Sequence, residues 1–517
     1  MTHPTLQMGM LLVLVLLSLA AAYCSAASDQ FRPNIFVLTD IENEPDDAQS
    51  LIRLLLYSNE IEILGITAVT SVWLNDTIRP DQVQRIVEGY GSVADNLRIH
   101  DERYPSVDHL LQLLSSGKPV YGMDAVDFKS PSRVSEGANA LIKAVDSLNN
   151  VAGNGDEDDL SGFLWVACWG GANVLAEALN KVRHERTDAE LNQFISKIKV
   201  YAISDQDDAG PWIRINFPNL TYVASIHTWN EYGLAEWVGL SGEKFYNFDE
   251  GGPDTNLVSH EWLKSNIQIG PLGAFYPDFA FIMEGDTPSF LGLIPNGLNH
   301  PARIDYGGWG GRYKPVDQSL KHTHHYADVA DAVVGLDGRT YKSSQACIWR
   351  WRHAYQNDFA ARMQWTIKGS YQGANHAPVV SLNGTVSAKP YQITAPLEKT
   401  GNTSVILDVS QSYDPDKGDR IQQVDLFQYK EVSSWQWATH FVVPDLSIEP
   451  LCETNQQSPC GLFKVLIPPR GDPQRTPSTY HLIVQIKDSG VPQMYSYRRV
   501  IINTTPATER DTGKDEL

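Results

Sequence analysis

Five carboxylates lie within eight consecutive positions, from Asp40 to Asp47. Pro45 and the two aspartates after it suit the start of a helix, so part of the run has a purely structural explanation. That explanation does not cover Asp40, Glu42 and Glu44. Carboxylates this close raise one another's pKa unless a cation offsets the repulsion. Oxygen ligands without His or Cys favour Ca²⁺ and, less strongly, Mg²⁺, so the run predicts a metal or catalytic site.

The flanking residues predict that this acidic run is a strand-to-helix turn. Residues 34–38 have the composition of a buried strand, residues 46–57 the periodicity of an amphipathic helix, and residues 61–69 form the next apolar run. Similar alternation continues from about Arg32 to Trp365, which predicts an α/β fold with a mostly parallel sheet flanked by helices. Such folds bind ligands at the carboxyl ends of their strands, where the acidic run would lie.

A second polar turn follows the strand predicted for residues 198–203. By the same rule, Asp205, Gln206 and Asp207 would face the crevice, and their amide and carboxylate groups could bind sugar hydroxyls. A plain polar turn explains these residues equally well.

A glycine-rich run from Gly307 to Arg312 contains one tryptophan. Glycines allow backbone to approach a ligand closely, so Trp309 could stack on a sugar ring with Arg312 beside it. A single Trp is more often part of a hydrophobic core.

Three segments resemble calcium-dependent nucleoside hydrolases: the Asp-rich run from Val37 to Ala48, the strand-like residues 63–69, and the turn formed by residues 169–173. A closer resemblance rests on Glu42–Ala48, Gly307–Tyr313 and the β-rich C-terminal segment. Together these resemble a nucleoside-hydrolase-like family whose bacterial members are called cellulose-binding proteins. This second resemblance spans nearly the whole mature chain and implies the same α/β fold.

The resemblance also implies roles for individual residues. Asp47 matches a bidentate calcium ligand, Asp46 a carboxylate that binds sugar hydroxyls, and the Ala172 carbonyl another calcium ligand. Asn173, the next residue, is expected to contact the substrate.

Two further positions mark where the chain departs from the nucleoside hydrolases. Glu42 stands where they have an Asp that both ligates calcium and activates water, and Asp286 is the best match for the last metal carboxylate. The ribose-binding Asn expected after the second strand is not found at residues 70–72.

These residues leave two functions open. In the first, the chain hydrolyses glycosyl bonds, most readily of N-glycosyl compounds, with Glu42 taking a proton from a calcium-held water. In the second, it is a non-catalytic protein that binds a cellulose-like glycan. The dense carboxylates favour the first, and the missing ribose contact favours the second. The expected partner is a carbohydrate or a nucleoside-like small molecule.

The chain changes character after the α/β domain predicted for residues 32–372. Short strand-like runs separated by turns predict a β-sandwich over residues 376–505, resembling immunoglobulin-like and cadherin-like modules. Its acidic loops at residues 412–416 and 488–492 could bind calcium or be simple turns. Cys452 and Cys460 flank a polar loop and are expected to form a disulfide.

Both ends of the chain carry address signals. An apolar run followed by small residues predicts a signal peptide over residues 1–26, and the tail at 506–517 ends in Lys514-Asp515-Glu516-Leu517, the tetrapeptide read by the KDEL receptor. The expected location is the endoplasmic reticulum lumen, with partial secretion, and no membrane insertion after signal cleavage. Five sequons fit this route: Asn75, Asn219, Asn383, Asn402 and Asn503.

The formal charge of −21 argues against nucleic acid as a partner. A phosphate backbone needs a concentrated Lys/Arg surface, and the sequence clusters these residues nowhere.

Overall fold

The computed structural model describes residues 32–149, 162–228, 231–398, 400–433, 443–452, 459–469 and 478–506. The described residues from Pro33 onward belong to one compact unit. The predicted signal peptide and retrieval tetrapeptide lie outside the described residues.

A sheet of eight strands forms the centre of the α/β part, in the order β3-β2-β1-β4-β5-β6-β8-β7. All neighbouring strands are parallel except β7 and β8. This confirms the α/β fold with a mostly parallel sheet. The strands are β1 (Asn34–Thr39), β2 (Glu62–Ala68), β3 (Leu114–Ser116), β4 (Leu164–Cys168), β5 (Ile198–Ala202), β6 (Thr221–Ala224), β7 (Tyr313–Pro315) and β8 (His325–Asp328).

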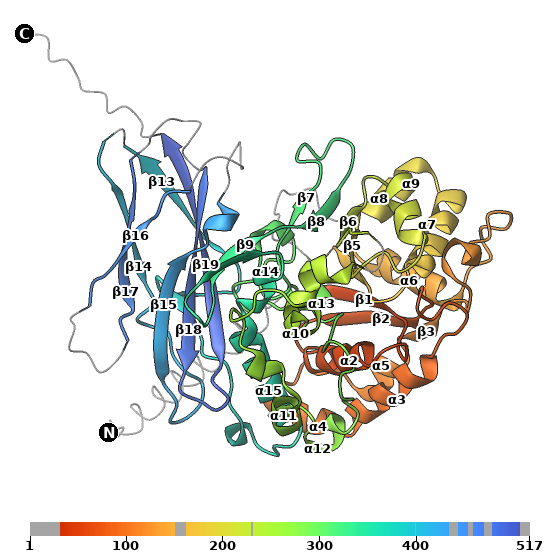
Figure 1. Cartoon of the computed structure of the whole chain (residues 1–517), viewed down its shortest axis with the longest axis horizontal. Helices are drawn as coiled ribbons and strands as arrows, with labels where there is room; N and C mark the ends of the chain where they lie inside the picture. Colours follow the sequence, from red (N-terminus) through yellow and green to blue (C-terminus); the bar gives the residue numbers. More distant parts are fainter. Residues whose placement is uncertain are drawn as a thin grey trace, which may run out of the picture. The chain divides into compact units, whose positions relative to one another are not determined.

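Strand β1 is buried on both faces because helices cover both sides of the sheet (Figure 1). Ile35 and Val37 pack into one hydrophobic core with α2 and α3, whereas Phe36 and Leu38 pack into another with α6 and α7. A strand covered on both faces has a continuous apolar sequence rather than an alternating one. These helices are α2 (Asp46–Leu56), α3 (Pro80–Gly91), α6 (Glu136–Ser147) and α7 (Asn173–Glu185).

Further helices complete the α/β part. They are α4 (Ala94–His100), α5 (Val107–Leu111), α8 (Asp188–Ser196), α9 (Ala209–Asn216), α10 (Glu243–Tyr246), α11 (His260–Asn266), α12 (Gly270–Gly273), α13 (Pro288–Leu291), α14 (Ala346–Trp349) and α15 (Arg352–Trp365). A hairpin of β9 (Asp331–Val334) and β10 (Thr340–Ser343) precedes α14.

Two sheets with a shared hydrophobic core make up the C-terminal segment, as expected of a β-sandwich. One has the order β13-β19-β18-β15 and the other β14-β17-β16. Their strands are β13 (Tyr391–Leu397), β14 (Thr403–Asp408), β15 (Ile421–Gln428), β16 (Ser447–Pro450), β17 (Leu462–Ile467), β18 (Thr479–Asp488) and β19 (Tyr495–Pro506), preceded by the short hairpin β11 (Ser381–Leu382) and β12 (Thr385–Val386). Residues 434–442, within the predicted β-sandwich, lie outside the described residues.

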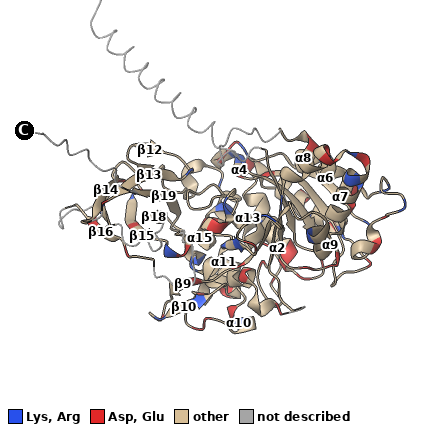
Figure 2. Ribbon diagram, turned by 90° about the horizontal axis from the view of Figure 1, so that it is seen from above, with Lys and Arg blue, Asp and Glu red and all other residues tan. Residues whose placement is uncertain are grey.

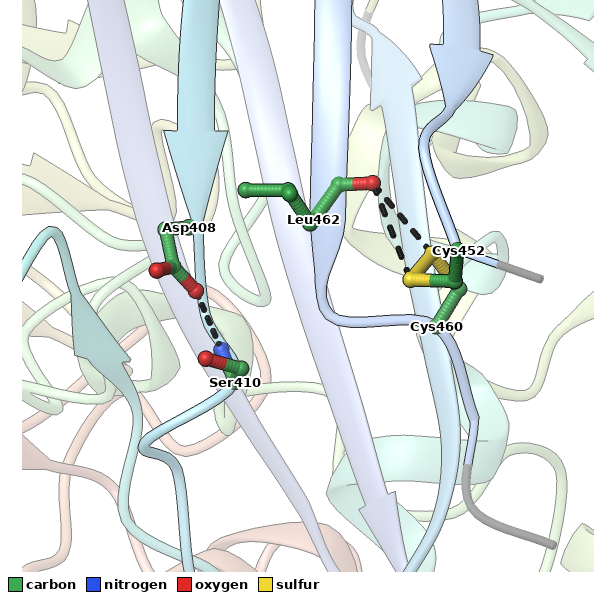
Figure 3. The surroundings of a disulfide bond; sticks show 5 residues. All are labelled: Asp408, Ser410, Cys452, Cys460 and Leu462. Carbon is green, nitrogen blue, oxygen red and sulfur yellow. Dashed lines mark hydrogen bonds between the residues drawn. A yellow bond between two sulfur atoms is a disulfide. The ribbon is translucent and has the colours of Figure 1, made fainter. Parts of the chain in front are cut away.

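A disulfide joins Cys452 and Cys460 between β16 and β17, with 5.5 Å between their Cα atoms (Figure 3). The carbonyl oxygen of Leu462, in β17, lies 3.2 Å from the Cys460 sulfur. The bridge therefore closes the connection between two neighbouring strands of one sheet.

The β-sandwich is bonded to the α/β part through buried side chains. Arg499, in β19, is fully buried and donates to the carbonyls of Leu298 (2.8 Å) and Gly307 (2.7 Å). The Tyr429 hydroxyl donates to Asp331 at 2.6 Å. The two predicted domains thus share an interface in which polar groups are paired.

Acidic and basic residues are interspersed along α6 and α7 (Figure 2), and Arg186, at the end of α7, pairs with Asp146 at 2.6 Å. Within the part of the chain that is described, no helix is long and apolar enough to cross a membrane. Four of the five sequon asparagines are exposed, and Asn503 is half-buried.

One buried ion pair fixes α2 against the segment that follows α12. Arg53, in α2, donates to Glu284 at 2.6 Å, and neither side chain is exposed. Arg53 also donates to the Tyr355 carbonyl at 2.7 Å, and Glu284 accepts from the Tyr276 hydroxyl at 2.7 Å and from Thr287 at 3.0 Å. Because its charges are matched and bonded on several sides, this pair can be held away from water.

Glu284→Gln should lower the free energy of unfolding by about 3–5 kcal/mol, because it leaves the Arg53 guanidinium buried without a counter-charge. As a control, Arg339→Gln removes an ion-pairing side chain that is 70% exposed and should cost at most about 1 kcal/mol. Urea unfolding followed by tryptophan fluorescence measures both. Equal costs for the two variants would contradict the anchoring role of the buried pair.

Candidate metal centre and ligand pocket

A pocket of about 260 Å³ opens beside the carboxyl ends of β1 and β4. From β1 the chain first adds β2 and β3 on one side of the sheet and then β4, β5 and β6 on the other side. The pocket therefore lies at the point where the order of the strands changes direction, which is where open α/β sheets bind ligands. Carboxylates and aromatic rings dominate the lining, which consists of Asp40, Asn43, Glu44, Asp46, Asp47, Trp73, Trp169, Ile203, Gln206, Tyr232, Trp237, Phe245, Tyr246, Phe281, Ile282 and Asp286.

The acidic turn is built by local hydrogen bonds. Thr39, the last residue of β1, donates its hydroxyl to the Asp47 carboxylate and accepts from the Ile41 backbone N–H at 3.2 Å. Asp46 and Asp47 occupy the first turn of α2, where the helix dipole favours negative charge. The Thr39–Asp47 hydrogen bond thereby joins the end of β1 directly to the first turn of α2.

Three carboxylates meet at the floor of the pocket. One oxygen each of Asp46, Asp47 and Asp286 lie within 4.8 Å of one another. Asp286 reaches this position because it follows Glu284, which Arg53 holds against α2. A Cβ at the intervening Gly285 would lie 2.7 Å from an Asp46 oxygen, so a side chain at this position would displace the Asp46 carboxylate.

Burial and mutual repulsion perturb these acids. Burial, together with repulsion from Glu44, raises the pKa of Asp40 to about 6 and that of Asp46 to about 7. Burial, followed by repulsion from neighbouring acids, raises the pKa of Asp47 and that of Asp286 well above their ordinary values. The fold therefore holds these carboxylates together against their electrostatic preference.

The donor set fits a hard divalent cation. One Asp286 oxygen is buried without a hydrogen-bond partner, and no Lys, Arg or His in the described ranges forms an ion pair with Asp40, Asp46, Asp47 or Asp286. Buried carboxylates require a compensating charge. Calcium, with its flexible shell of oxygen ligands, suits such a group.

Glu42 does not belong to this cluster. It lies in the turn with φ of 80°, its side chain is 41% exposed, and it faces Arg79 at 3.5 Å. Asp40, two residues earlier, is 3% exposed and lines the pocket instead. Of these two acids, Asp40 therefore faces the pocket, whereas Glu42 faces Arg79 because the chain turns outward after Ile41.

Ala172 and Asn173 lie next to the pocket but do not line it. The Ala172 carbonyl accepts the first hydrogen bond of α7, from Ala176 at 3.0 Å. Asn173 is buried and donates to the Thr70 hydroxyl at 2.9 Å. The Ala172 carbonyl thus begins α7, and Asn173 joins α7 to the loop after β2.

Of the second polar turn, only Gln206 lines the pocket, where it donates to the Trp169 carbonyl. Asp207 is buried and accepts from the backbone N–H of Asn173 and of Ala209, each at 3.0 Å, so it caps two helices. Asp205 is paired with Arg214 at 2.6 Å. The polar-turn explanation therefore accounts for both aspartates.

Trp309 and Arg312 are not available to a sugar. Trp309 is 1% exposed, and Arg312 is 2% exposed and donates to Asp331 at 2.8 Å. Neither lines the acidic pocket. The glycines around them allow tight backbone packing, with Gly310 against Gly292, instead of access for a ligand.

Sequence reasoning missed the aromatic walls of the pocket. Trp169 is anchored by donating to the Ser289 hydroxyl at 2.8 Å, and Trp73 and Tyr232 have ring centroids 6.3 Å apart. The ring centroids of Phe245 and Phe281 lie 5.4 Å apart, and the two residues are 49% and 51% exposed. The sequence shows these aromatic residues, but nothing in their spacing connects them with one another or with the acidic run.

Asp286→Asn should weaken Ca²⁺ binding in the pocket roughly 10-fold or more, since it removes one of three converging carboxylates. Glu42→Gln should change the affinity by less than about 2-fold, because an exposed charge is screened by solvent. Calorimetric titration of Ca²⁺ into each variant measures this. If Glu42→Gln weakened binding as much as Asp286→Asn, Glu42 would have to be counted among the ligands.

Two family models match the chain. "Cellulose-binding Sde182, nucleoside hydrolase-like domain" matches residues 34–313, and "Cellulose-binding protein Sde0182, C-terminal domain" matches residues 404–504. Comparison with curated proteins gave no match.

Among solved structures, the chain is similar to a nucleoside hydrolase-related hypothetical protein from Saccharophagus degradans that is described as associated with carbohydrate metabolism. The two are 31% identical, the similarity covers 92% of this chain and 100% of that one, and the TM-score is 0.70. The type III effector protein XopQ complexed with adenosine diphosphate ribose is 10% identical over 66% of this chain and 95% of its own, with a TM-score of 0.32. The family matches and the full-length relative confirm the resemblance found in the sequence: the chain belongs to the nucleoside-hydrolase-like family of Sde182 cellulose-binding proteins.

Proposed function

We propose that this protein is a metal-dependent hydrolase of glycosyl bonds, acting most readily on N-glycosyl compounds. The observation that carries the proposal is the convergence of Asp46, Asp47 and Asp286 within 4.8 Å at the floor of an open pocket. A purely structural cluster of buried acids would be paired with Lys or Arg, as Glu284 is with Arg53.

Asp46, Asp47 and Asp286 are the residues that would hold calcium. A calcium ion there would supply positive charge for polarising a water and for binding neighbouring sugar hydroxyls. The protein's own side chains must then orient the sugar, exclude solvent and accept a proton from the water.

Asp40 is the proposed proton acceptor. It follows the last residue of β1, lines the pocket and forms a hydrogen bond with the Ser71 side chain. A Cβ at Gly170 would lie 2.8 Å from its carboxylate, so the backbone after β4 supports it closely from behind. As a water attacks the anomeric carbon and loses its proton to Asp40, the glycosyl bond would break, and the leaving group would depart with the bonding electrons and take up a proton from solvent. Direct attack predicts inversion of the anomeric configuration.

The aromatic walls suit a sugar ring and the group attached to it. Trp169 and Trp237 are almost fully buried and shape the inner part, whereas Trp73, Phe245 and Phe281 are 40–51% exposed at the mouth. Aromatic faces pack against sugar and base rings, and their apolar surface excludes water from the bond to be broken. The pocket thus has a polar floor for hydroxyls and an apolar mouth for a leaving group.

The second candidate is carbohydrate binding without turnover. Two observations favour it. The first is the name of the family, whose members are called cellulose-binding. The second is that the side chains in the loop after β2 are used within the protein, since Ser71 is hydrogen-bonded to Asp40 and Thr70 to Asn173. Residues 70–72 therefore offer no side-chain amide for ribose. The same pocket would serve this function, so only catalysis distinguishes the two candidates.

Asp40→Asn should abolish chelator-sensitive release of sugar, with a loss of about 100-fold or more in kcat, because the amide cannot accept the proton. Glu42→Gln is the matched control and should retain activity. The assay measures reducing-sugar release from nucleosides, other N-glycosides and cello-oligosaccharides, with and without EDTA, and NMR identifies the anomer first formed. No release from any substrate, combined with glycan binding, would favour the non-catalytic candidate.

Trp73→Ala should weaken binding of substrates with a ring-shaped leaving group by about 1 kcal/mol, or roughly 5-fold in KM, because it removes one wall of the mouth. Phe128→Ala, which changes a ring that is 54% exposed outside the pocket, should leave KM unchanged. Steady-state kinetics or equilibrium binding measures both. An unchanged KM in Trp73→Ala would show that the mouth of the pocket does not contribute to substrate binding.

A further inference from the structure

The acidic pocket combines carboxylates with aromatic rings over its whole lining. Five of the lining residues are acids and seven are aromatic, and no Lys, Arg or His stands among the described residues that line it. The face of an aromatic ring is negative and attracts cations, as a carboxylate does. Both kinds of group therefore favour a ligand that carries positive charge.

The rings at the mouth are held in place by contacts with one another. The Trp73 side chain is hydrogen-bonded to Tyr232, and the centroids of the two rings lie 6.3 Å apart. Phe245 packs edge-on against Tyr246, with 4.8 Å between their centroids. A Cβ at Gly233 would lie 3.1 Å from the Tyr246 ring, so the two pairs of rings adjoin. The mouth is thus an ordered group of aromatic faces.

Glu44 lies between these rings and the acids of the floor. It is half-buried and lines the pocket. Burial, together with the charge on Glu44, raises the pKa of Asp46 on the floor and raises that of Tyr246 at the mouth to about 12, so the carboxylate is near both. Within the described ranges, no hydrogen bond or ion pair uses the Glu44 carboxylate. It is therefore available to a charge on a ligand.

Neither the protein nor a bound metal would neutralise the pocket. Arg79, in the loop that follows Trp73, pairs with Asp81 at 2.9 Å and with Glu42 at 3.5 Å, and it does not line the pocket. One calcium ion on the floor would offset two of the five carboxylate charges. The pocket would therefore still attract a cation at its mouth when the metal is bound.

We propose that the substrate is an N-glycosyl cation, in which the nitrogen bonded to the sugar belongs to a positively charged ring such as a pyridinium. The inference rests on the proposed function, since it concerns the same pocket and the same bond. The sugar hydroxyls would face the acidic floor, and the charged ring would lie among the aromatic faces beside Glu44. A phosphorylated glycoside is disfavoured because the described lining has no cation for the phosphate.

A charged leaving group also simplifies the reaction. As water attacks the anomeric carbon, its proton goes to Asp40, the bond between carbon and ring nitrogen breaks, and the electron pair of that bond returns to the nitrogen. The ring leaves as a neutral molecule and needs no proton, whereas a neutral base must take one up. Positive charge moves meanwhile onto the sugar, toward the acids of the floor. The absence of Lys and His from the described lining is then no obstacle.

Binding of two leaving groups tests the mouth without turnover. Ring-methylated nicotinamide carries a fixed positive charge, whereas nicotinamide has the same ring and is neutral. Calorimetric titration into the full chain with Ca²⁺ present should show roughly 10-fold tighter binding of the cation, and less at high salt. Glu44→Gln, and separately Phe245→Leu, should remove most of this preference. Glu42→Gln removes the same charge outside the pocket and should preserve it. Equal binding of the two compounds, or an equal loss in Glu42→Gln, would overturn the proposal.

Hydrolysis separates this inference from the proposed function. N-glycosyl pyridinium and N-glycosyl pyridone, each prepared with ribose and with glucose, have nearly the same shape, and only the first is charged. Relative to the uncatalysed rates, kcat/KM should be roughly 10-fold higher for the cation, and Glu44→Gln should reduce the advantage through KM. Equal values would overturn the inference and leave the hydrolase intact, as would a Glu44→Gln variant that loses kcat on the pyridone alone. Preferential binding of the cation without release from any substrate would support the inference and contradict the proposed hydrolysis.

Discussion

The buried pair of Arg53 and Glu284 is the constraint on which the site depends. It joins residues 231 positions apart, one in the helix that carries Asp46 and Asp47 and the other two residues before Asp286. Together with the bonds of Gln49 to the Glu284 backbone and of Ser50 to Thr287, this contact holds the third carboxylate beside the first two. The matched charges also compensate each other, so the repulsion inside the pocket is confined to the acids that face it.

The pocket shows the opposite arrangement of charge. Its acids are buried next to one another at the junction of β1 and β4, and their pKa values are raised because neither a protein cation nor sufficient solvent stabilises the ionised forms. Such an arrangement lowers the stability of the fold and is retained where it serves binding or catalysis. Gly170 and Gly285 permit it, since a side chain at either position would displace a carboxylate.

Much of the local structure could be predicted from the sequence because it depends on local signals. The apolar run of β1 and the periodicity of α2 fixed the strand-to-helix turn within a residue or two, and the family resemblance supplied Asp286. The choice between Asp40 and Glu42 could not be made this way. It depends on where the backbone leaves the sheet, and the positive φ of Glu42 turns that residue outward. Trp309 was misjudged because glycine-rich backbone serves tight packing as readily as ligand approach, and the aromatic walls come from segments that no periodicity connects.

The central claim is that Asp46, Asp47 and Asp286 form a metal centre beside Asp40. Anomalous diffraction from crystals soaked in a terbium salt, with terbium substituting for calcium, tests it most directly. The account predicts a strong peak within bonding distance of all three carboxylates and none at Glu42. A peak coordinated by Glu42 instead, or no peak in the pocket at a terbium concentration that saturates the protein in solution, would contradict it.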